Sequence, residues 1–354
     1  MTNSRTVYHS QVRELLDCSV SCHQPISGSF ELTSRCNLAC RMCYVRQAAG
    51  DSFYKGKELS PAQWLLLAQQ ALDNGLLFLT LTGGEIFLRQ DFFEIYEPLT
   101  RMGFILTLMT NGTLITDEIA NRLVQSPPNH INITIYGASK ETYQTVTGVA
   151  DGFNNCCAGI ETLIAHHLPI GLKTTITRQN VSDLTAMKEM ARNWEIPLIA
   201  SWLLAERRDG KKSDVENCRL SAKDGVKLEA LDGDYLEDWE EARKLFAKNR
   251  GNFYCRAGKA TFAITSFGEM NVCLNLPLPA CMPLETGFRD AWDHLESFVD
   301  SAPPATSACK DCDARGYCQL CPSWSYFENG TLNNPVSYLC EIARERKKVR
   351  LPNS

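Results

Sequence analysis

Between about residues 29 and 205, short runs rich in β-branched and aromatic residues alternate with stretches whose apolar residues recur every three or four positions. The first pattern is typical of strands and the second of amphipathic helices. The sequence therefore predicts six strands, at residues 29–33, 77–83, 104–110, 131–137, 171–177 and 197–205. It predicts helices between them, at residues 60–75, 91–103, 116–125, 152–167 and 181–194.

Strands that alternate with helices favour an α/β fold with a parallel sheet joined by right-handed crossovers. Six such units are fewer than the eight that close a full barrel. Two architectures are then open to the chain, a partial barrel and an open doubly wound sheet. We take the partial (β/α)6 barrel, similar to part of a TIM barrel, as the predicted fold.

Composition changes twice after the predicted barrel. The segment ERRDGKKSD and the later DYLEDWEEARKLFAKNR are charged, and we interpret them as a solvated loop and an amphipathic helix. From residue 251 the chain is rich in Cys, Gly and Pro, which favours a small domain held together by metal. The basic RERKKVR near the end is interpreted as a solvated helix end. The predicted parts are an N-terminal extension at 1–28, the barrel at 29–205, a charged helical linker at 206–250, a Cys-rich domain at 251–345 and a basic tail at 346–354.

The composition also limits the classes of partner. A net charge of −5 gives no general reason to expect nucleic acid or an anionic membrane as a partner. The chain has no apolar run of the roughly 20 residues that span a bilayer, and its start lacks the apolar stretch of a secretion signal. We expect a cytoplasmic protein, in which 16 cysteines are more typical of metal binding or redox chemistry than of disulfides.

Three cysteines directly follow the first predicted strand, at Cys36, Cys40 and Cys43. Structural zinc takes four protein ligands, and no histidine lies close by in the sequence to supply the fourth. A four-iron cluster held by three cysteines instead leaves one iron open to an exogenous ligand. The spacing therefore favours such a cluster over a zinc loop or incidental thiols.

The CxxxCxxC spacing followed by Tyr44 resembles the signature of the radical S-adenosylmethionine (SAM) superfamily. The resemblance implies that the open iron of a [4Fe–4S] cluster binds the amino and carboxylate groups of SAM. It further implies reductive cleavage of SAM to a 5′-deoxyadenosyl radical, which abstracts hydrogen from a substrate. The cofactor carries this chemistry, and the protein supplies position and electrostatics.

Further motifs at the ends of the predicted strands support the resemblance. Ligands bind at the C-terminal ends of the strands in parallel α/β sheets. The Gly-Gly-Glu motif implies a backbone that approaches SAM closely and a Glu85 carboxylate that accepts hydrogen bonds from its ammonium group. For Tyr136 and Asn180 a purely structural role is equally open. The residues expected to contact SAM are Tyr44, Gly83, Gly84, Glu85, Asn111, Thr134, Tyr136 and Asn180.

The C-terminal cysteines resemble the SPASM extension, which holds two auxiliary [4Fe–4S] clusters in relatives of this kind. The resemblance implies an outer cluster on Cys309, Cys312, Cys318 and Cys340, and an inner cluster on Cys255, Cys273 and Cys321. Either Cys281 is the fourth inner ligand or one iron is open. Two residues separate Cys318 from Cys321, where the family more commonly has three. A zinc ribbon built from the two CxxC pairs is the alternative.

The resemblance implies hydrogen abstraction but leaves the substrate open. Enzymes with SPASM extensions often modify peptides, so we expect oxidative crosslinking of a ribosomally made peptide. The sulfatase maturases carry an aspartate just after the second SPASM cysteine, whereas this chain has Leu274 and Asn275 there. Only about 28 residues precede the first strand, so a leader-binding module is expected to be absent or encoded separately.

Two alternatives and one further partner complete the expectations. The enzyme could instead act on a small molecule such as a sugar, a tetrapyrrole or a cofactor precursor. A non-catalytic iron–sulfur electron carrier is disfavoured, because a carrier has no use for an open iron or for the Gly83–Gly84–Glu85 motif. Reduction of the SAM-binding cluster implies a flavodoxin- or ferredoxin-like electron donor.

Overall fold

The computed structural model describes residues 12, 14–211, 213–231, 253 and 255–349. Its main sheet has eight strands in these residues, and all of them except β10 run parallel. A small second sheet joins β2 (Arg35–Cys36) to β3 (Gln47–Ala48). The main sheet has the order β10 (Met270–Asn271), β9 (Thr261–Ile264), β1 (Ser27–Thr33), β4 (Phe78–Gly83), β5 (Ile105–Thr110), β6 (His130–Thr134), β7 (Ile170–Thr175) and β8 (Leu198–Ser201).

The order of the strands distinguishes between the two predicted architectures. From β1 through β4 to β8, every crossover moves one strand in the same direction. A doubly wound sheet reverses its direction at a switch point, and this run of strands does not. Right-handed crossovers in one direction place all the helices on one face of the sheet. The prediction of a partial barrel is confirmed, and the doubly wound alternative was wrong.

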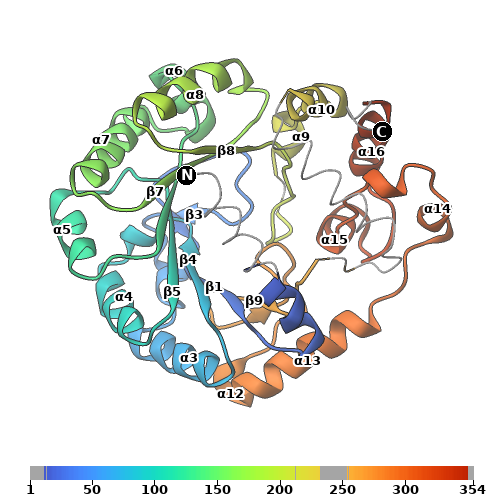
Figure 1. Cartoon of the computed structure of the whole chain (residues 1–354), viewed down its shortest axis with the longest axis horizontal. Helices are drawn as coiled ribbons and strands as arrows, with labels where there is room; N and C mark the ends of the chain where they lie inside the picture. The colour runs from blue at the N-terminus through green and yellow to red at the C-terminus, as the bar shows by residue number, and fades with distance from the viewer. Residues whose placement is uncertain (1–11, 13, 212, 232–252, 254, 350–354) are drawn as a thin grey trace.

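The helices after the first five barrel strands form an arc outside the sheet (Figure 1). The sequence predicted all of them except α6 and the short η1. Helix α3 shows why the prediction worked, because Ser60 and Gln63 form a capping box and Pro61 opens the first turn. The arc consists of α3 (Pro61–Asp73), η1 (Ile86–Leu88), α4 (Phe92–Arg101), α5 (Asp117–Gln125), α6 (Lys140–Thr147), α7 (Gly152–Ala165), η2 (Val181–Asp183) and α8 (Leu184–Asn193).

The two faces of the barrel sheet differ in burial. Side chains that face the helices are buried, and Phe30 on β1 packs on Trp64 of α3 with ring centroids 4.9 Å apart. Successive strand residues point to opposite faces. Many of the alternate, inward-facing positions are half-buried or exposed, among them Ser29, Thr80, Thr107, Thr134, Lys173 and Ile199. The interior of this partial barrel is therefore an open, largely polar space.

The Cys-rich region joins the barrel through a strand that the sequence analysis did not predict. Strand β9 pairs in parallel with β1, and Phe262 on it packs against Trp292. A four-residue run next to several glycines carries too weak a pattern to identify from the sequence. Further helices in the described part of the chain include α2 (Ser52–Lys55), α9 (Val215–Cys218), α10 (Ala222–Ala230), α12 (Pro283–Thr286), α13 (Phe288–Ser301), α14 (Ser307–Lys310), η3 (Arg315–Tyr317), α15 (Pro322–Asn329) and α16 (Ser337–Lys348).

A buried ion pair joins the end of the barrel to the C-terminal helix. Glu229 on α10 accepts hydrogen bonds from Trp202 at 2.8 Å and from the Arg346 guanidinium at 2.6 and 2.9 Å. Side chains of both ionic partners are at most 4% exposed. The interpretation of this basic segment as a solvated helix end was thus wrong at Arg346.

The charged linker is likewise only partly as expected. Residues 215–218 and 222–230 form α9 and α10, and Arg208 in the preceding loop is largely buried rather than solvated. The helix predicted from DYLEDWEEARKLFAKNR lies outside the described residues. The domain boundaries remain a prediction. Within the described residues, none of the helices combines the length and hydropathy that crossing a membrane requires.

We expect Arg346→Met to lower the free energy of unfolding by about 3–5 kcal/mol, because it leaves the Glu229 carboxylate buried without its counter-charge. The neighbouring Lys347 pairs with Asp313 at an exposed position, so Lys347→Met should cost less than about 1 kcal/mol. Urea unfolding followed by tryptophan fluorescence measures both. Equal losses in the two variants would contradict a stabilising role for the buried pair.

Candidate active site and cysteine clusters

A cavity of about 310 Å³ lies at the C-terminal ends of the barrel strands. It is lined by thiols, glycine backbone, polar side chains and several apolar side chains from the strand ends and the loops that follow them. Asn275, from the Cys-rich region, reaches the same cavity. Of the predicted site residues, the structure brings together Cys36, Cys40, Cys43, Tyr44, Gly83, Gly84, Asn111, Thr134 and Tyr136 around it.

The three N-terminal thiols fit a metal cluster. Burial raises the pKa of Cys36 to about 12, and it also raises the pKa values of Cys40 and Cys43. Neighbouring thiols oppose ionisation further at Cys36 and Cys40. Three buried thiols that repel each other as thiolates need a strong positive charge to ionise together, and a metal centre supplies one.

The loop that carries Cys36 is held by the end of β5. Asn111 donates a hydrogen bond to Asn37 at 2.9 Å and approaches the Cys36 sulfur at 3.6 Å. The side-chain carbonyl oxygen of Asn111 accepts hydrogen bonds from the Thr113 amide and hydroxyl. Asn37 donates a hydrogen bond to the same hydroxyl at 2.8 Å. Asn111 therefore positions a cysteine as well as lining the cavity.

Glu85 does not line the cavity, in contrast to the expectation of direct contact with SAM. It is fully buried, and its carboxylate accepts from the Thr110 hydroxyl at 2.7 Å, the Asn111 amide at 2.7 Å and the Phe87 amide at 3.2 Å. Burial raises the pKa of this carboxyl, while these hydrogen bonds lower it. In this structure Glu85 joins the end of β4 to the end of β5.

The two cavity glycines have a packing reason that the sequence did not reveal. A Cβ at Gly83 would lie 2.3 Å from the Thr33 carbonyl oxygen, and one at Gly84 would lie 2.1 Å from the Arg35 carbonyl oxygen. Both distances are shorter than any side chain tolerates. The glycines thus let β4 approach the backbone that leads into the cysteine loop.

The remaining predicted contacts have different positions. The Tyr136 hydroxyl interacts with the Cys40 thiol in the sense that lowers the pKa of Cys40, and Thr134 lines the cavity on the same strand end. Asn180 is fully buried and donates to the Tyr136 and Thr175 carbonyls at 3.0 Å each. Asn180 is absent from the cavity wall, so its observed role is to support Tyr136.

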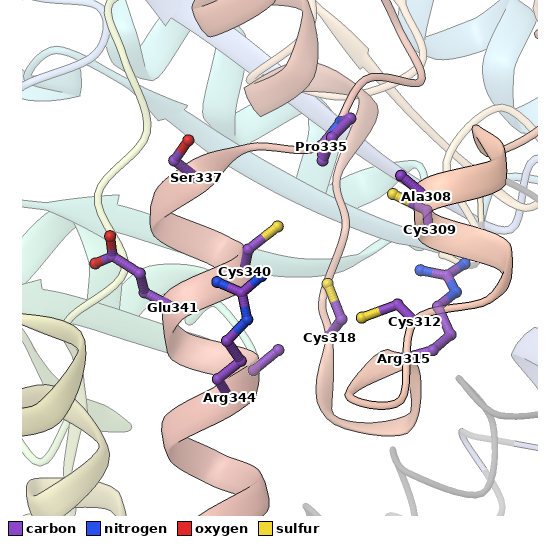
Figure 2. A pocket seen from close by; sticks show the side chains of 11 residues that line it. Ala308, Cys309, Cys312, Arg315, Cys318, Pro335, Ser337, Cys340, Glu341 and Arg344 are labelled. Carbon is purple, nitrogen blue, oxygen red and sulfur yellow. The ribbon is translucent and has the colours of Figure 1, made fainter.

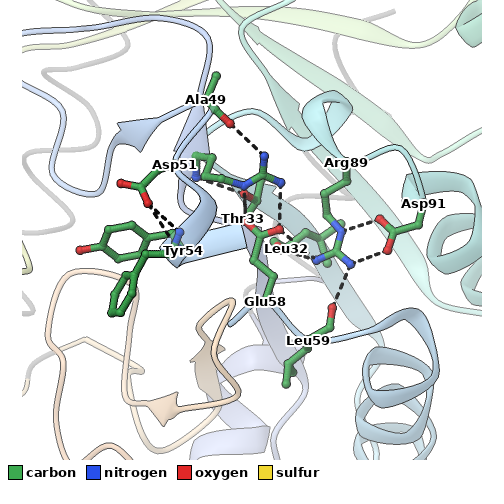
Figure 3. Close-up of polar contacts among 11 residues, drawn as sticks. Leu32, Thr33, Ala49, Asp51, Tyr54, Glu58, Leu59, Arg89 and Asp91 are labelled. Atoms are coloured by element: carbon green, nitrogen blue, oxygen red, sulfur yellow. Dashed lines mark hydrogen bonds and ion pairs between the residues drawn. The ribbon is translucent and has the colours of Figure 1, made fainter. Parts of the chain in front are cut away.

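A polar network on the other side of β1 also supports the cysteine loop and was missed in the sequence (Figure 3). Arg35 forms a bidentate ion pair with Glu58, with N–O distances of 2.8 and 2.9 Å. It also donates a hydrogen bond to the Ala49 carbonyl. Arg89 binds the Leu32 carbonyl at 2.8 Å and also pairs with Asp91. The charged groups of this network satisfy one another's hydrogen-bonding needs. We therefore interpret the network as a structural support for the backbone next to Cys36.

Arg208 joins the N-terminal cysteine loop to the Cys-rich region. Its guanidinium binds both oxygens of Glu31 on β1, at 2.7 and 2.8 Å, and the Leu274 carbonyl at 3.2 Å. Its backbone amide donates to the Tyr44 carbonyl at 2.9 Å. Burial raises the pKa of Glu31, and the Arg208 charge lowers it. The charge pattern of the segment alone could not have revealed this contact.

Three C-terminal thiols form a second group. Burial raises the pKa values of Cys255, Cys273 and Cys321, and the charges of Cys255 and Cys273 contribute to the rise at Cys321. Cys281 differs, because burial raises its pKa and no other thiol of the described residues contributes. The structure therefore gathers Cys255, Cys273 and Cys321 and leaves Cys281 outside this electrostatic group.

Four further thiols line a separate cavity of about 400 Å³, together with Arg315 and Arg344. Figure 2 shows Cys340 projecting from α16 toward the loop that carries Cys312 and Cys318. The fourth thiol, Cys309, lines the same cavity. The structure thus brings together the four thiols that were predicted to bind the outer cluster. Across the described residues, no three Cys, His or acidic side chains are arranged to hold a single metal ion.

Comparison with known proteins agrees with this geometry. The sequence model of the radical SAM superfamily matches residues 30–191. Over 325 residues the chain is 26% identical to the AdoMet-dependent heme synthase of Methanosarcina barkeri, a match that covers 85% of this chain and 92% of that relative. It is 24% identical to the subtilosin biosynthesis protein AlbA of Bacillus subtilis, over 84% of this chain and 67% of AlbA.

Other relatives match over a shorter span. The chain is 33% identical to a probable GTP 3′,8-cyclase of Saccharolobus islandicus over 46% of its own length, and it spans about half (51%) of that relative. Among solved structures, SuiB of Streptococcus suis bound to S-adenosylmethionine has the same fold, with a TM-score of 0.69 at 16% identity, over 93% of this chain and 81% of SuiB. Residues 30–191 of this chain are therefore a radical SAM domain, and a Cys-rich region follows it toward the C-terminus.

Proposed function

We propose that this protein binds SAM and a [4Fe–4S] cluster in the 310 Å³ cavity and oxidatively modifies a ribosomally made peptide. The observation that carries the proposal is the convergence of Cys36, Cys40 and Cys43 at the ends of the parallel strands, beside the glycine backbone of Gly83 and Gly84. When bound, the reduced cluster and SAM supply a 5′-deoxyadenosyl radical that takes a hydrogen atom from a substrate C–H bond.

The residues of the chain orient these groups. Asn111 and Asn37 hold the cysteine loop, Tyr136 donates toward Cys40, and the glycines expose backbone to the cavity. We propose that Cys309, Cys312, Cys318 and Cys340 hold an outer auxiliary cluster. We further propose that Cys255, Cys273 and Cys321 hold an inner one with an open position. Clusters of this kind can accept the second electron of an oxidation.

Two likenesses support a peptide as the substrate. AlbA, which takes part in the biosynthesis of the bacteriocin subtilosin, is similar to 84% of the length of this chain. SuiB, whose fold the chain shares, has also been solved bound to its precursor peptide SuiA, with a TM-score of 0.69 at 17% identity. The similarity to AlbA includes the Cys-rich region, so it is not confined to the part that cleaves SAM.

One observation favours a small molecule instead. The heme synthase of Methanosarcina barkeri matches over 92% of its own length, a larger share than AlbA does. A porphyrin precursor that carries carboxylates is therefore the second candidate substrate. Under both candidates we propose a flavodoxin- or ferredoxin-like protein as the electron donor, since the cluster must be reduced before SAM is cleaved.

We expect the anaerobically reconstituted protein to release 5′-deoxyadenosine from SAM in the presence of dithionite. Replacing Cys36, Cys40 and Cys43 together with alanine should reduce this release to background, because the cluster loses every protein ligand. Cys157→Ala is the matched control, since this half-buried thiol on α7 lies outside the cavity. Mass spectrometry measures the nucleoside, and equal release from both variants would contradict the proposed SAM site.

Adding candidate substrates to the same assay distinguishes a peptide substrate from a small-molecule substrate. A mass decrease in the peptide encoded beside the gene, corresponding to lost hydrogens, supports peptide maturation, and fragmentation locates the new bond. Nucleoside release with an unchanged peptide and an altered porphyrin favours the small-molecule reading. If intact clusters cleave no SAM, the enzyme class itself is wrong for this chain.

Iron analysis tests the auxiliary ligands. We expect Cys281→Ala to keep the iron content and the auxiliary-cluster EPR signals of the wild type, because its thiol lies outside the group formed by Cys255, Cys273 and Cys321. A variant without Cys309, Cys312 and Cys340 should lose about four irons per chain. An equal loss of iron in Cys281→Ala would identify Cys281 as a cluster ligand.

A further inference from the structure

One basic side chain on the inner face of the barrel has no role in the site described so far. Lys173 lies on β7, opposite Thr134 of β6 in the register of the sheet. Thr134 lines the cavity of the three cysteines, and so does Thr175, two residues beyond Lys173 on the same face of β7. Lys173 therefore lies inside the barrel, beside Thr134 and two residues before Thr175, at the edge of the cavity wall.

The surroundings of Lys173 do not neutralise its charge. Its ammonium group lies 4.0 Å from the sulfur of Met109, another residue of the cavity wall, and no acidic side chain of the described residues pairs with it. The buried Glu31 carboxylate on β1 is already paired with the Arg208 guanidinium. Burial lowers the pKa of Lys173, as expected for an ammonium group that has lost water and gained no counter-charge.

A half-buried lysine without a counter-ion is costly unless something else supplies the negative charge. The space next to Lys173 is open, because the inward side chains of β8 are poorly covered and Ile199, its neighbour on that strand, is 62% exposed. A ligand inside the barrel can therefore approach Lys173 along the side that faces β8.

We propose that Lys173 binds a carboxylate of the substrate inside the barrel and so positions the substrate below SAM. This inference rests on the proposed function and deepens it. A carboxylate matches the single positive charge and three donors of an ammonium group. The carboxylate can belong to an acidic peptide residue or to a porphyrin propionate, and the experiment below distinguishes these sources.

The test compares binding of acidic and neutral forms of two probes to the reconstituted holoenzyme with SAM. The first probe is the peptide encoded beside the gene, with its Asp and Glu residues intact or replaced by Asn and Gln. The second is protoporphyrin IX and its dimethyl ester. The variants are Lys173→Met, Lys173→Arg and, as the matched control, Lys223→Met, which removes an exposed lysine on α10.

We expect the wild type to bind the acidic form of one probe roughly tenfold or more tightly than its neutral form, the effect of one charge-assisted hydrogen bond. Lys173→Met should bring the two affinities within about twofold, whereas Lys173→Arg and Lys223→Met retain the difference. The probe that shows the preference identifies the source of the carboxylate. Substrate-free release of 5′-deoxyadenosine should be unchanged in all variants, and the melting temperature of substrate-free Lys173→Met should not fall, because the variant removes a half-buried charge that has no counter-ion.

The outcomes separate the two proposals. If no variant and no wild type cleaves SAM, the proposed function fails. If SAM cleavage is normal but the wild type prefers neither acidic probe, or if Lys173→Met keeps the preference, carboxylate binding by Lys173 is overturned. A Lys173→Met variant that loses SAM cleavage or stability, while Lys173→Arg does not, also overturns it and assigns the lysine to the fold.

Discussion

The buried contact between Arg208 and Glu31 connects the parts of the molecule that carry the cysteines. Glu31 lies on β1, next to the N-terminal cysteine loop, and Arg208 reaches from there to the Leu274 carbonyl beside Cys273. A guanidinium that binds a carboxylate through two hydrogen bonds has little rotational freedom. Because losing either partner would leave the other charge buried, the pair holds both loops at a set position. The placement of Cys273 relative to the cavity lined by Cys36, Cys40 and Cys43 depends on this contact.

The polar side chains nearest the cavity obey the same constraint. Glu85, Asn111 and Asn180 use most of their hydrogen-bonding capacity on the backbone and side chains of neighbouring strand ends. Buried polar groups must be hydrogen-bonded. Residues that a motif suggests as ligand contacts therefore also hold neighbouring strand ends together. The result is a preorganised wall, in which the positions of the three thiols are set by strands that are themselves tied together.

The sequence was informative wherever a local pattern decides the structure. Periodicity and caps predicted the barrel strands and five helices, and the resemblance to radical SAM and SPASM motifs implied which thiols share a cavity. It was uninformative wherever a distant partner decides. A charged segment looks the same whether Arg208 is solvated or bound to Glu31, 177 residues away. The same holds for Arg346 and for β9, whose four residues form a strand because β1 offers them an edge.

The direction in which the strands wind also explains where specificity can reside. Every crossover from β1 to β8 places its helix outside the sheet, so none of these crossover helices covers the inner face, and many side chains there stay half-exposed. The cysteine loop and the glycines occupy the strand ends, where they can bind SAM but can distinguish little else. Under the proposal, discrimination between substrates resides in inward-facing side chains such as Lys173 and in Asn275, which the Cys-rich region adds to the cavity. Neither belongs to the motif that identifies the domain, which explains how relatives named for heme synthesis and for subtilosin biosynthesis can both be similar to this chain.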